Sequence, residues 1–355
     1  MRVELPDLGF KDLVEIARAG RCSGCGTCTA ACPLQMVEFE NDLPTIGDSE
    51  CLHDLYESCG LCYLLCPQTT RDGLQAEEVI ANPLGKVLIG EKDEPQIHLG
   101  YAADPVIREK GQSGGLITAA LVGGLKTGYL DAVTIVKGEE NLETRVVSAT
   151  TGEEVINGAG TQYTRIPVVE AAWSLRRRHG TRFAFTGTPC MILGMRALQK
   201  IGFHESIKAT TLIGVFCSKS FQADPLRRKI QELTGRSAEQ VSRIAIKGKV
   251  SIAFADGDSH VFNLDDILAA AQDSCQYCPD FLAEYADISV GEMGAPPGHS
   301  IVLVRTQKGY DLLANAQEAG ELVLEPCDEK IIKRLKKWAK KKRDEARAWA
   351  VSPLE

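Results

Sequence analysis

The sequence lacks an apolar run long enough to cross a lipid bilayer. A membrane-spanning helix needs about 20 consecutive apolar residues, whereas the longest apolar stretch of note, 116–125, contains two glycines. The first 20 residues carry Glu4, Asp7, Asp12 and Glu15, so we expect no secretory signal peptide there. There is no low-complexity segment and no long repeat beyond two cysteine motifs. These absences argue against a membrane-spanning or secreted protein.

A net positive charge is also missing. The 355 residues carry a formal net charge of −8, with 44% hydrophobic and 25% charged residues. This is the composition of an ordinary globular protein, and the length allows one large domain and one small one. The charge is uneven, because 330–347 holds ten basic residues against two acidic ones, which leaves about −16 for the rest. We therefore expect no nucleic-acid partner.

Cysteine, by contrast, is abundant, and eight of the thirteen cysteines fall within 21–67. They form two runs, Cys22-x2-Cys25-x2-Cys28-x3-Cys32-Pro33 and Cys51-x7-Cys59-x2-Cys62-x3-Cys66-Pro67. The first run has the spacing of a bacterial ferredoxin with two [4Fe–4S] clusters, in which the fourth cysteine of a run serves the other cluster. We therefore predict two clusters, held by Cys22, Cys25, Cys28 and Cys66 and by Cys32, Cys51, Cys59 and Cys62.

Other interpretations of these eight cysteines fit less well. Disulfides need an oxidising compartment, to which nothing in the sequence points. Structural zinc sites usually use two Cys-x2-Cys pairs and do not need eight cysteines in this order. One departure concerns Cys51, which is followed by seven residues where a regular ferredoxin has two. Cys51 can serve as a ligand only if that insertion is looped out.

The rest of the chain alternates between strand and helix patterns. We predict strands at 130–137, 182–185, 211–217, 286–290 and 300–305, and helices at 1–20, 116–122, 170–179 and 191–198. Asp256-Gly257 predicts the turn of a β-hairpin. Strands that alternate with helices indicate an α/β domain. The expected organisation is a two-cluster ferredoxin-like domain and polar linker at 1–95, an α/β domain at 96–327 and a basic helical tail at 328–355.

Four of the remaining cysteines suggest a third cluster. Cys190 and Cys217 follow predicted strands, and Cys275 and Cys278 form a Cys-x2-Cys pair. Four thiols gathered from separate loops at one end of a sheet would complete a third [4Fe–4S] centre. The alternative is that Cys190 and Cys217 are buried apolar residues, since free cysteine is often buried. Cys327 is isolated, and we assign it no role.

Gly111-Gln112-Ser113-Gly114-Gly115 lies directly before the predicted helix 116–122. Glycines at a helix start let backbone N–H groups approach an anion, and the helix dipole favours phosphate there. Taken alone, the stretch is explained at least as well by a plain capped turn.

Several separated motifs resemble the family of coenzyme F420-reducing hydrogenase beta subunits. They are the glycine turn 111–115, Thr186-Gly187-Thr188-Pro189-Cys190, Gly214-Val215-Phe216-Cys217, Cys275-x2-Cys278-Pro279-Asp280 and Ala286-Asp287-Ile288-Ser289-Val290-Gly291. The resemblance covers 97–316, and it departs from the family at Glu292, where an aspartate is more common. The family includes the beta subunit of F420-dependent formate dehydrogenase and the input subunit of archaeal F420H2 dehydrogenases. A ferredoxin module ahead of the flavin domain is similar to that input subunit, which occurs in methanogens.

The resemblance implies a set of cofactors. The family holds a [4Fe–4S] cluster at the cysteines that match Cys190, Cys217, Cys275 and Cys278, and it binds FAD, against which the deazaflavin F420 docks. The FAD contacts that we expect are Ser113, Gly114, Gly115, Thr118, Gln162, Tyr163, Thr186, Gly187, Thr188, Gly291, Ser300 and Arg305. The candidates for the acidic tail of F420 are Lys219 and Lys247. Any of these residues could instead serve a turn, a cap or a solvated surface.

The function implied by the resemblance is oxidation of F420H2. Hydride would pass to FAD, and single electrons would pass through three clusters to the subunits of a membrane complex that reduces quinone or phenazine. One alternative is an F420 oxidoreductase linked to ferredoxin or to heterodisulfide reductase. Others are a ferredoxin-dependent reductase of another substrate and a plain electron-transfer adaptor. No side chain is nominated as a catalytic acid or base.

The basic tail predicts an amphipathic helix whose apolar side is formed by Ile331, Leu335 and Trp338. Such a helix can lie on an anionic membrane surface, dock on an acidic partner or stay solvated. We expect a cytoplasmic protein, seated by this helix on the cytoplasmic face of a membrane-bound complex.

Overall fold

The computed structural model describes residues 13–40, 43–46, 60–69, 95–179, 182–201, 207 and 209–350. The predicted ligands Cys51 and Cys59 lie outside the described residues, as do most of the predicted linker and the first half of the predicted helix 1–20.

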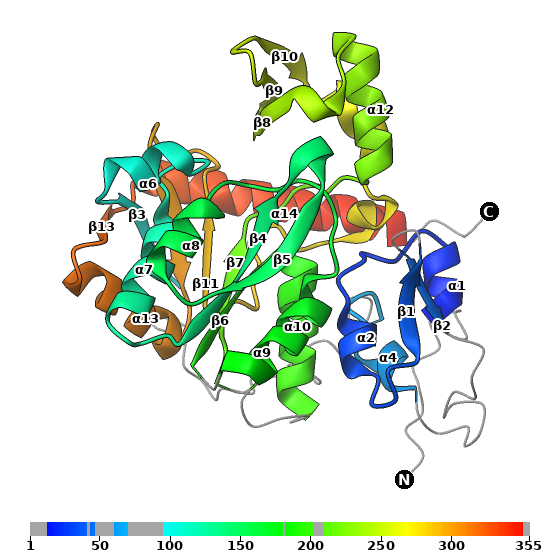
Figure 1. Cartoon of the computed structure of the whole chain (residues 1–355), viewed down its shortest axis with the longest axis horizontal. Coiled ribbons are helices and arrows are strands. Elements are labelled where there is room, and N and C mark those ends of the chain that lie inside the picture. Colours follow the sequence, from blue (N-terminus) through cyan, green and yellow to red (C-terminus); the bar gives the residue numbers. More distant parts are fainter. Residues whose placement is uncertain are drawn as a thin grey trace.

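An eight-stranded mixed sheet forms the centre of the described residues (Figure 1). Its strand order is β13-β3-β12-β11-β7-β6-β4-β5. The inner strands β11, β7, β6 and β4 run parallel to one another, and the outer strands pair antiparallel. The strands are β3 (Gln96–Ala102), β4 (Ala132–Gly138), β5 (Thr144–Ala149), β6 (Phe183–Gly187), β7 (Thr211–Val215), β11 (Ile288–Gly291), β12 (Ser300–Val304) and β13 (Leu322–Pro326).

Helices cover both faces of this sheet, because its buried strands carry apolar side chains on both sides. In β12, Val302 and Val304 pack with α7 (Leu116–Lys126) and α13 (Gln307–Glu318), whereas Ile301 and Leu303 pack with α14 (Glu329–Ala350). On the face of α14, Phe183 of β6 packs with α9 (Val168–His179) and α10 (Pro189–Ile201). The predicted α/β domain, with its strands β4, β6, β7, β11 and β12 and its helices α7, α9 and α10, is therefore confirmed.

A small lobe stands over one edge of the sheet (Figure 1). It pairs β8 (Val241–Lys247), β9 (Lys249–Phe254) and β10 (Ser259–Asn263) antiparallel, with α12 (Ala223–Thr234) against them. The predicted hairpin is β9–β10, and Gly257 in its turn has a φ of +91°. The core of the lobe is separate from that of the sheet and includes Phe221, Ile230 and Phe254.

The N-terminal segment packs beside α9 and α10 (Figure 1). Its described elements are α1 (Leu13–Arg18), α2 (Thr27–Ala31), β1 (Val37–Glu40), β2 (Leu43–Ile46) and α4 (Leu61–Leu64). The contact with the large domain is close, because a Cβ added at Gly194 of α10 would overlap the Thr27 hydroxyl. The amide of Val169 also donates to the Cys25 carbonyl at 3.0 Å. The remaining elements are α6 (Pro105–Lys110), α8 (Gly152–Asn157), η2 (Glu140–Leu142), η3 (Ala238–Gln240), η4 (Leu264–Ala270) and η5 (Asp273–Tyr277).

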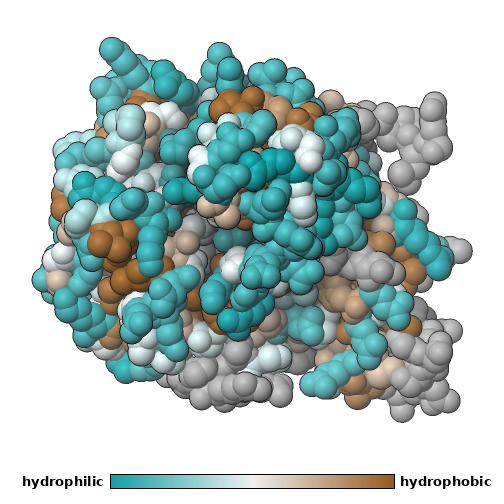
Figure 2. Space-filling view, turned by 45° about the horizontal axis from the view of Figure 1, so that its top comes forward, coloured by the Kyte–Doolittle hydropathy of each residue, from teal (hydrophilic) through white to brown (hydrophobic). Residues whose placement is uncertain are grey.

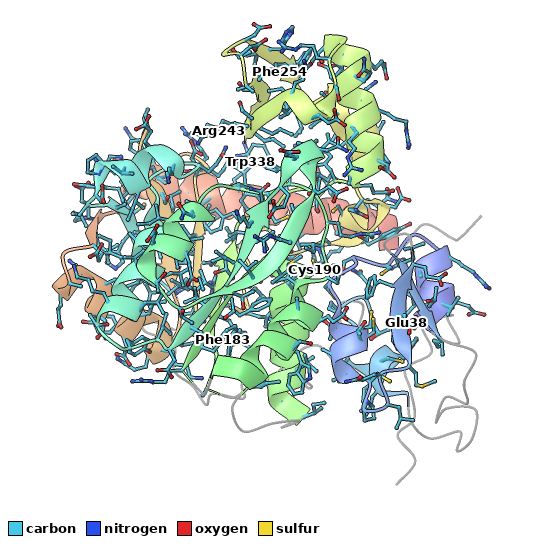
Figure 3. All side chains as sticks on the ribbon, viewed as in Figure 1. Glu38, Phe183, Cys190, Arg243, Phe254 and Trp338 are labelled. Carbon is cyan, nitrogen blue, oxygen red and sulfur yellow. The ribbon has the colours of Figure 1, made fainter. Side chains whose placement is uncertain are left out.

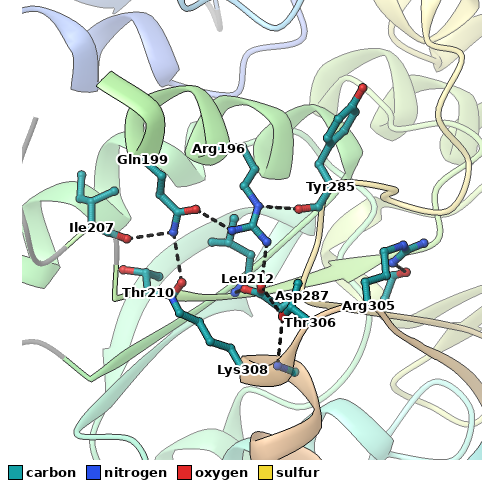
Figure 4. A network of polar contacts seen from close by, with 12 residues as sticks. Arg196, Gln199, Ile207, Thr210, Leu212, Tyr285, Asp287, Arg305, Thr306 and Lys308 are labelled. Carbon is teal, nitrogen blue, oxygen red and sulfur yellow. Dashed lines mark hydrogen bonds and ion pairs between the residues drawn. The ribbon is translucent and has the colours of Figure 1, made fainter. Parts of the chain in front are cut away.

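A buried ion pair ties α10 to the sheet (Figure 4). Arg196 Nη2 lies 2.8 Å from Asp287 Oδ1, and both side chains are almost fully buried. The same carboxylate accepts hydrogen bonds from the Thr306 hydroxyl and from the Leu212 amide, both at 2.7 Å. Arg196 also donates to the Tyr285 carbonyl. Every polar group of this pair has partners, which offsets the cost of burying two charges.

The surface is mostly hydrophilic in the view of Figure 2, where the apolar patches are small and separate. Among the residues that the structure describes, no helix is both long enough and apolar enough to cross a membrane.

Candidate functional site

The carboxyl ends of the parallel strands meet at one edge of the sheet, and in α/β folds ligands bind at that edge. Cys190 follows β6, Cys217 follows β7 and Glu292 follows β11. The glycine turn 111–115 reaches the same edge, because the amide of Gly114 donates to the Ser300 hydroxyl at 3.3 Å at the start of β12. The predicted residues from four distant motifs are thus brought together.

The glycines of the turn are required by close packing. Gly115 has a φ of +68° and begins α7. A Cβ added at Gly114 would lie 2.8 Å from the Gly100 carbonyl oxygen and 2.9 Å from that of Gly298. The turn therefore sits tightly between β3 and the loop before β12, which fixes the position of Ser113.

The carboxylate of Glu292 lies beside this turn. The Ser113 hydroxyl donates to Glu292 Oε2 at 2.6 Å, and Lys247 Nζ lies 2.5 Å from Glu292 Oε1. Lys247 ends β8, so this contact links the small lobe to the sheet edge. The predicted contacts Ser113 and Lys247 therefore meet at Glu292.

A cavity of about 300 Å³ lies between the turn, the end of β4 and the small lobe. Its wall includes Gln112 and the predicted contacts Gln162 and Tyr163, together with the cations Lys110, Lys137 and Arg243. Gln112 Nε2 is buried and has no hydrogen-bond partner within the described residues. The wall also includes the carboxylate of Glu139, which pairs with Arg145. Three cations and an unpaired amide donor suit a ligand that carries anionic and acceptor groups, as the phosphates of FAD do. The residues present therefore fit the implied cofactor.

Tyr163 connects this cavity to the cysteines. Its hydroxyl accepts a hydrogen bond from the Ile246 amide at 3.1 Å, and its carbonyl accepts one from the Phe221 amide at 2.9 Å. Burial raises the pKa of Tyr163 to about 12, and the nearby charges of Glu292 and Cys217 act in the same direction. The phenol is thus neutral at physiological pH.

The four cysteines of the predicted third centre lie close enough to influence one another electrostatically. The charges of Cys190, Cys275 and Cys278 all raise the pKa of Cys217, although burial is the main cause. Burial also raises the pKa of Cys275, whose sulfur accepts a hydrogen bond from the Ser220 amide at 3.4 Å. Burial thus favours the neutral thiol form of Cys217 and Cys275, and a bound metal would displace their protons. A set of four thiols with an N–H···S bond fits an iron–sulfur cluster.

The cysteines of the N-terminal segment form a second group. Burial raises the pKa of Cys28, and the charges of Cys25, Cys66, Cys22 and Cys62 add to the shift. The predicted ligands Cys22, Cys25, Cys28 and Cys66 are therefore neighbours. The Gly24 amide donates to Cys22 Sγ at 3.3 Å, and the Met36 amide donates to Cys32 Sγ at 3.2 Å.

Cys190 lies between the two groups. Its charge raises the pKa of Cys217 and also that of Cys25 and Cys22, where burial is again the main cause. Figure 3 shows Cys190 on the side of the large domain that faces the N-terminal segment. Arg21 packs over the Tyr277 ring at 3.9 Å, next to Cys278, and so closes the boundary between the segments.

The described cysteines are not arranged for a single metal ion. Within the described ranges, no three His, Cys, Asp or Glu side chains lie close enough to hold one. Four thiolates on one zinc ion would lie about 3.8 Å apart, given a Zn–S length of about 2.3 Å. A [4Fe–4S] cube is larger and needs a wider spacing of its four ligands.

The other predicted FAD and F420 contacts lie outside the cavity wall. Arg305 is buried and donates to the Ser289 hydroxyl and the Leu282 carbonyl. Gly291 leaves room for the Phe216 ring, and Gly187 leaves room for Phe185. Thr118 lies in α7. The Thr188 hydroxyl lies 3.2 Å from Cys190 Sγ, and the Lys219 carbonyl lies 3.7 Å from Cys217 Sγ. The Thr186 hydroxyl is buried and has no hydrogen-bond partner within the described part of the chain.

Sequence reasoning missed Lys110, Lys137 and Arg243. Arg243 lies on β8 of the small lobe (Figure 3) and donates to the Gly111 carbonyl at 2.8 Å. Its strand shows no motif, and only the long-range packing of the lobe brings it to the glycine turn. No local sequence pattern could therefore predict that Arg243 lies at the cavity.

The fold and the site together define an α/β domain with a group of thiols at the carboxyl edge of its sheet. Residues 97–172 match the family model described as coenzyme F420 hydrogenase/dehydrogenase, beta subunit N-term, and residues 180–330 match the model of its C terminus. The chain belongs to this family, as its motifs predicted.

Three relatives show how far the similarity extends. The chain is 34% identical to the coenzyme F420 hydrogenase subunit beta of Methanococcus voltae, over 64% of this chain and 83% of that one. It is 27% identical to a subunit of the F420H2 dehydrogenase of Methanosarcina mazei, over 88% and 87%. It is 29% identical to a coenzyme F420-dependent sulfite reductase of Methanocaldococcus jannaschii, over 94% of this chain. The chain spans only 52% of the sulfite reductase.

A solved structure shares the fold. A chain of the F420-reducing [NiFe] hydrogenase complex from Methanosarcina barkeri superimposes with a TM-score of 0.66 at 26% sequence identity. The match covers 74% of this chain and 94% of the other.

Proposed function

We propose that the chain is an oxidoreductase subunit that oxidises F420H2 by hydride transfer to FAD and delivers single electrons through three [4Fe–4S] clusters to a partner. FAD supplies the conversion of a two-electron hydride into single electrons, and the clusters supply one-electron transfer. The observation that carries the proposal is the position of Cys190, between the cysteines beside the cavity and those of the N-terminal segment. Family membership supports the choice of F420.

The cavity residues bind and orient the flavin cofactor in this proposal. Lys110, Lys137 and Arg243 neutralise its phosphates, and Gln112 Nε2 donates to an acceptor on it. Arg243 also holds the small lobe against the glycine turn. Tyr163 forms part of the cavity wall, and its hydroxyl is held by the Ile246 amide of the small lobe.

The cysteines set the order of electron transfer. Cys190, Cys217, Cys275 and Cys278 would hold the cluster next to the cavity. Because Cys190 lies near Cys22 and Cys25, the cluster of Cys22, Cys25, Cys28 and Cys66 comes next in the path. The cluster of Cys32, Cys51, Cys59 and Cys62 then stands last, toward the partner.

The partner is proposed to be an electron-accepting subunit of a larger complex at the cytoplasmic face of a membrane. The exposed side of α14 supports this location, since it presents Lys333, Lys337, Lys340 and Lys341 beside the exposed Trp338. The double variant Lys337→Glu, Lys340→Glu should lose binding to anionic vesicles in a flotation assay. Equal flotation of the variant and the unaltered chain would contradict binding of α14 to a membrane.

The sulfite reductase relative suggests a second kind of electron acceptor. The sulfite reductase relative aligns with almost the whole of this chain, which corresponds to about half of that protein. This chain could thus serve as the electron-input part of a reductase for another substrate. Anaerobic pull-down of the chain from its source cells, followed by identification of the bound redox subunit, distinguishes the two acceptors.

The cofactor content tests the proposal. We expect about twelve irons and one FAD per anaerobically purified chain, four irons for each predicted cluster. An iron content of about eight per chain would show that Cys190, Cys217, Cys275 and Cys278 hold no cluster. A chain without flavin would be an electron-transfer adaptor.

A further inference from the structure

One basic residue of the helix α14, Lys342, is directed into the protein instead of toward solvent. Its buried side is formed by Leu335, Ala339 and Ala346, with Ile331 partly buried. Lys342 falls on this same side, three residues after Ala339, so its side chain is directed into the protein. Trp338 is 39% exposed and lies off this side, contrary to our expectation that it forms part of the apolar side.

Lys342 reaches the cysteine group at the carboxyl edge of the sheet. Its ammonium group donates to the carbonyl of Cys217. Its charge also interacts with Cys275 and Cys278, and with Asp280. The position is fixed, because the next residue, Arg343, pairs with Glu284 at 2.5 Å, and α14 packs against η5, which carries Cys275.

The acidic neighbour of Lys342 is already engaged. The carboxylate of Asp280 accepts hydrogen bonds from the amides of Leu282 at 2.9 Å and Glu284 at 3.0 Å. The charge of Lys342 is therefore directed at the sulfurs as well as at a carboxylate. An alkyl ammonium group stays protonated at physiological pH, so this is a permanent positive charge beside three of the four thiols, those of Cys217, Cys275 and Cys278.

We propose that Lys342 is a positioning residue for electron transfer, whose fixed charge raises the reduction potential of the cluster held by Cys190, Cys217, Cys275 and Cys278. This inference rests on the proposed function. Reduction adds one electron from the flavin to the cluster, takes up no proton and makes the cluster more negative by one charge. A nearby cation stabilises the reduced state more than the oxidised one, since net charge and local electrostatics set the potentials of iron–sulfur clusters. The cluster beside the flavin thereby becomes the better first acceptor.

The test is an anaerobic redox titration of the full chain followed by electron paramagnetic resonance. The variant Lys342→Gln should lower one of three midpoint potentials, with the reduction equilibrium weakened about tenfold, which is about 59 mV for one electron. The signal affected should be the one that is absent from a Cys275→Ala variant. Lys342→Arg, which keeps the charge, should restore the potential. Lys341→Gln, which removes an exposed charge one position away, should leave all three unchanged.

Other outcomes would overturn the inference. Unchanged midpoint potentials in Lys342→Gln with a full iron content would show that the charge does not act on the cluster. Loss of four irons in Lys342→Gln would assign Lys342 to cluster assembly instead. A failure of the proposed function itself is distinguishable, because the unaltered chain would then show fewer than three clusters before any variant is compared.

Discussion

The Ser113 hydroxyl donates to the carboxylate of Glu292 at 2.6 Å, across 179 positions of sequence. This bond places a negative charge beside the glycine turn, whose residues Ser113, Gly114 and Gly115 we predicted to contact FAD. Lys247 neutralises part of that charge from the small lobe. An FAD bound at this turn would therefore compete with Glu292 for the Ser113 hydroxyl.

This competition gives the first prediction. Glu292→Gln should strengthen FAD binding about tenfold, or about 1.4 kcal/mol, because the amide keeps an acceptor for Ser113 but removes the repulsion of phosphate. Flavin fluorescence titration of the apoprotein measures the dissociation constant. Glu232→Gln, which alters an exposed carboxylate on α12, is the matched control. Unchanged or weaker FAD binding in Glu292→Gln would show that the FAD phosphates do not bind beside the glycine turn.

The cysteine assignment gives a second prediction. Cys190→Ala should remove four irons per chain and leave FAD bound, because an iron–sulfur cube needs its four thiolates. Cys327→Ala should change neither value, since Cys327 packs with the apolar cluster of α14 and belongs to neither cysteine group. Iron and flavin analysis of both variants decides the matter. Twelve irons in Cys190→Ala would exclude Cys190 as a ligand.

The contact between Gly194 and Thr27 gives a third prediction. Gly194→Ala adds a methyl group that overlaps the Thr27 side chain, so it should push α2 away from α10 and destabilise their packing by about 1–3 kcal/mol. Hydrogen exchange of residues 13–40 should increase in the variant. Adding Thr27→Ala makes room for the methyl group and should recover part of the protection. Purely additive effects of the two changes would show that the helices do not touch in solution.

The buried pair Arg196–Asp287 gives a fourth prediction. Arg196→Met should destabilise the large domain by about 3–5 kcal/mol, because it leaves an unpaired buried carboxylate. Urea unfolding measures this loss. Arg182→Met removes the exposed partner of Asp131 and should have a much smaller effect. Similar midpoints for the two variants would contradict the assignment of the buried pair as a structural anchor.

Local patterns were sufficient to predict much of the large domain. The apolar runs that became β4, β6 and β7 are flanked by glycines or helix signals, and Asp256-Gly257 marked the β9–β10 turn. The strands β3 and β13 were missed, because Gly100 and His98 interrupt the apolar pattern of β3 and its partners are distant in sequence. Pairing of that kind has no local signature.

The site shows the same division. Motif spacing predicted the cysteines and the glycine turn, and the described cysteines fall into two groups of neighbours. The spacing of α14 misplaced Trp338 on the buried side and left out Lys342, because hydropathy counts a lysine as exposed. A long side chain can bury its methylenes and still place its charge beside a partner. The cations around the cavity were missed because they come from three separate elements.

The most direct test of the account is an anaerobic reductive titration of the purified chain with F420H2, followed by visible absorbance. We predict that the flavin and cluster bands bleach with F420H2 and not with NADH, and that up to about 2.5 equivalents are consumed, since FAD takes two electrons and each of three clusters takes one. A chain that holds flavin but stays oxidised with F420H2, or that NADH reduces equally well, would contradict the account.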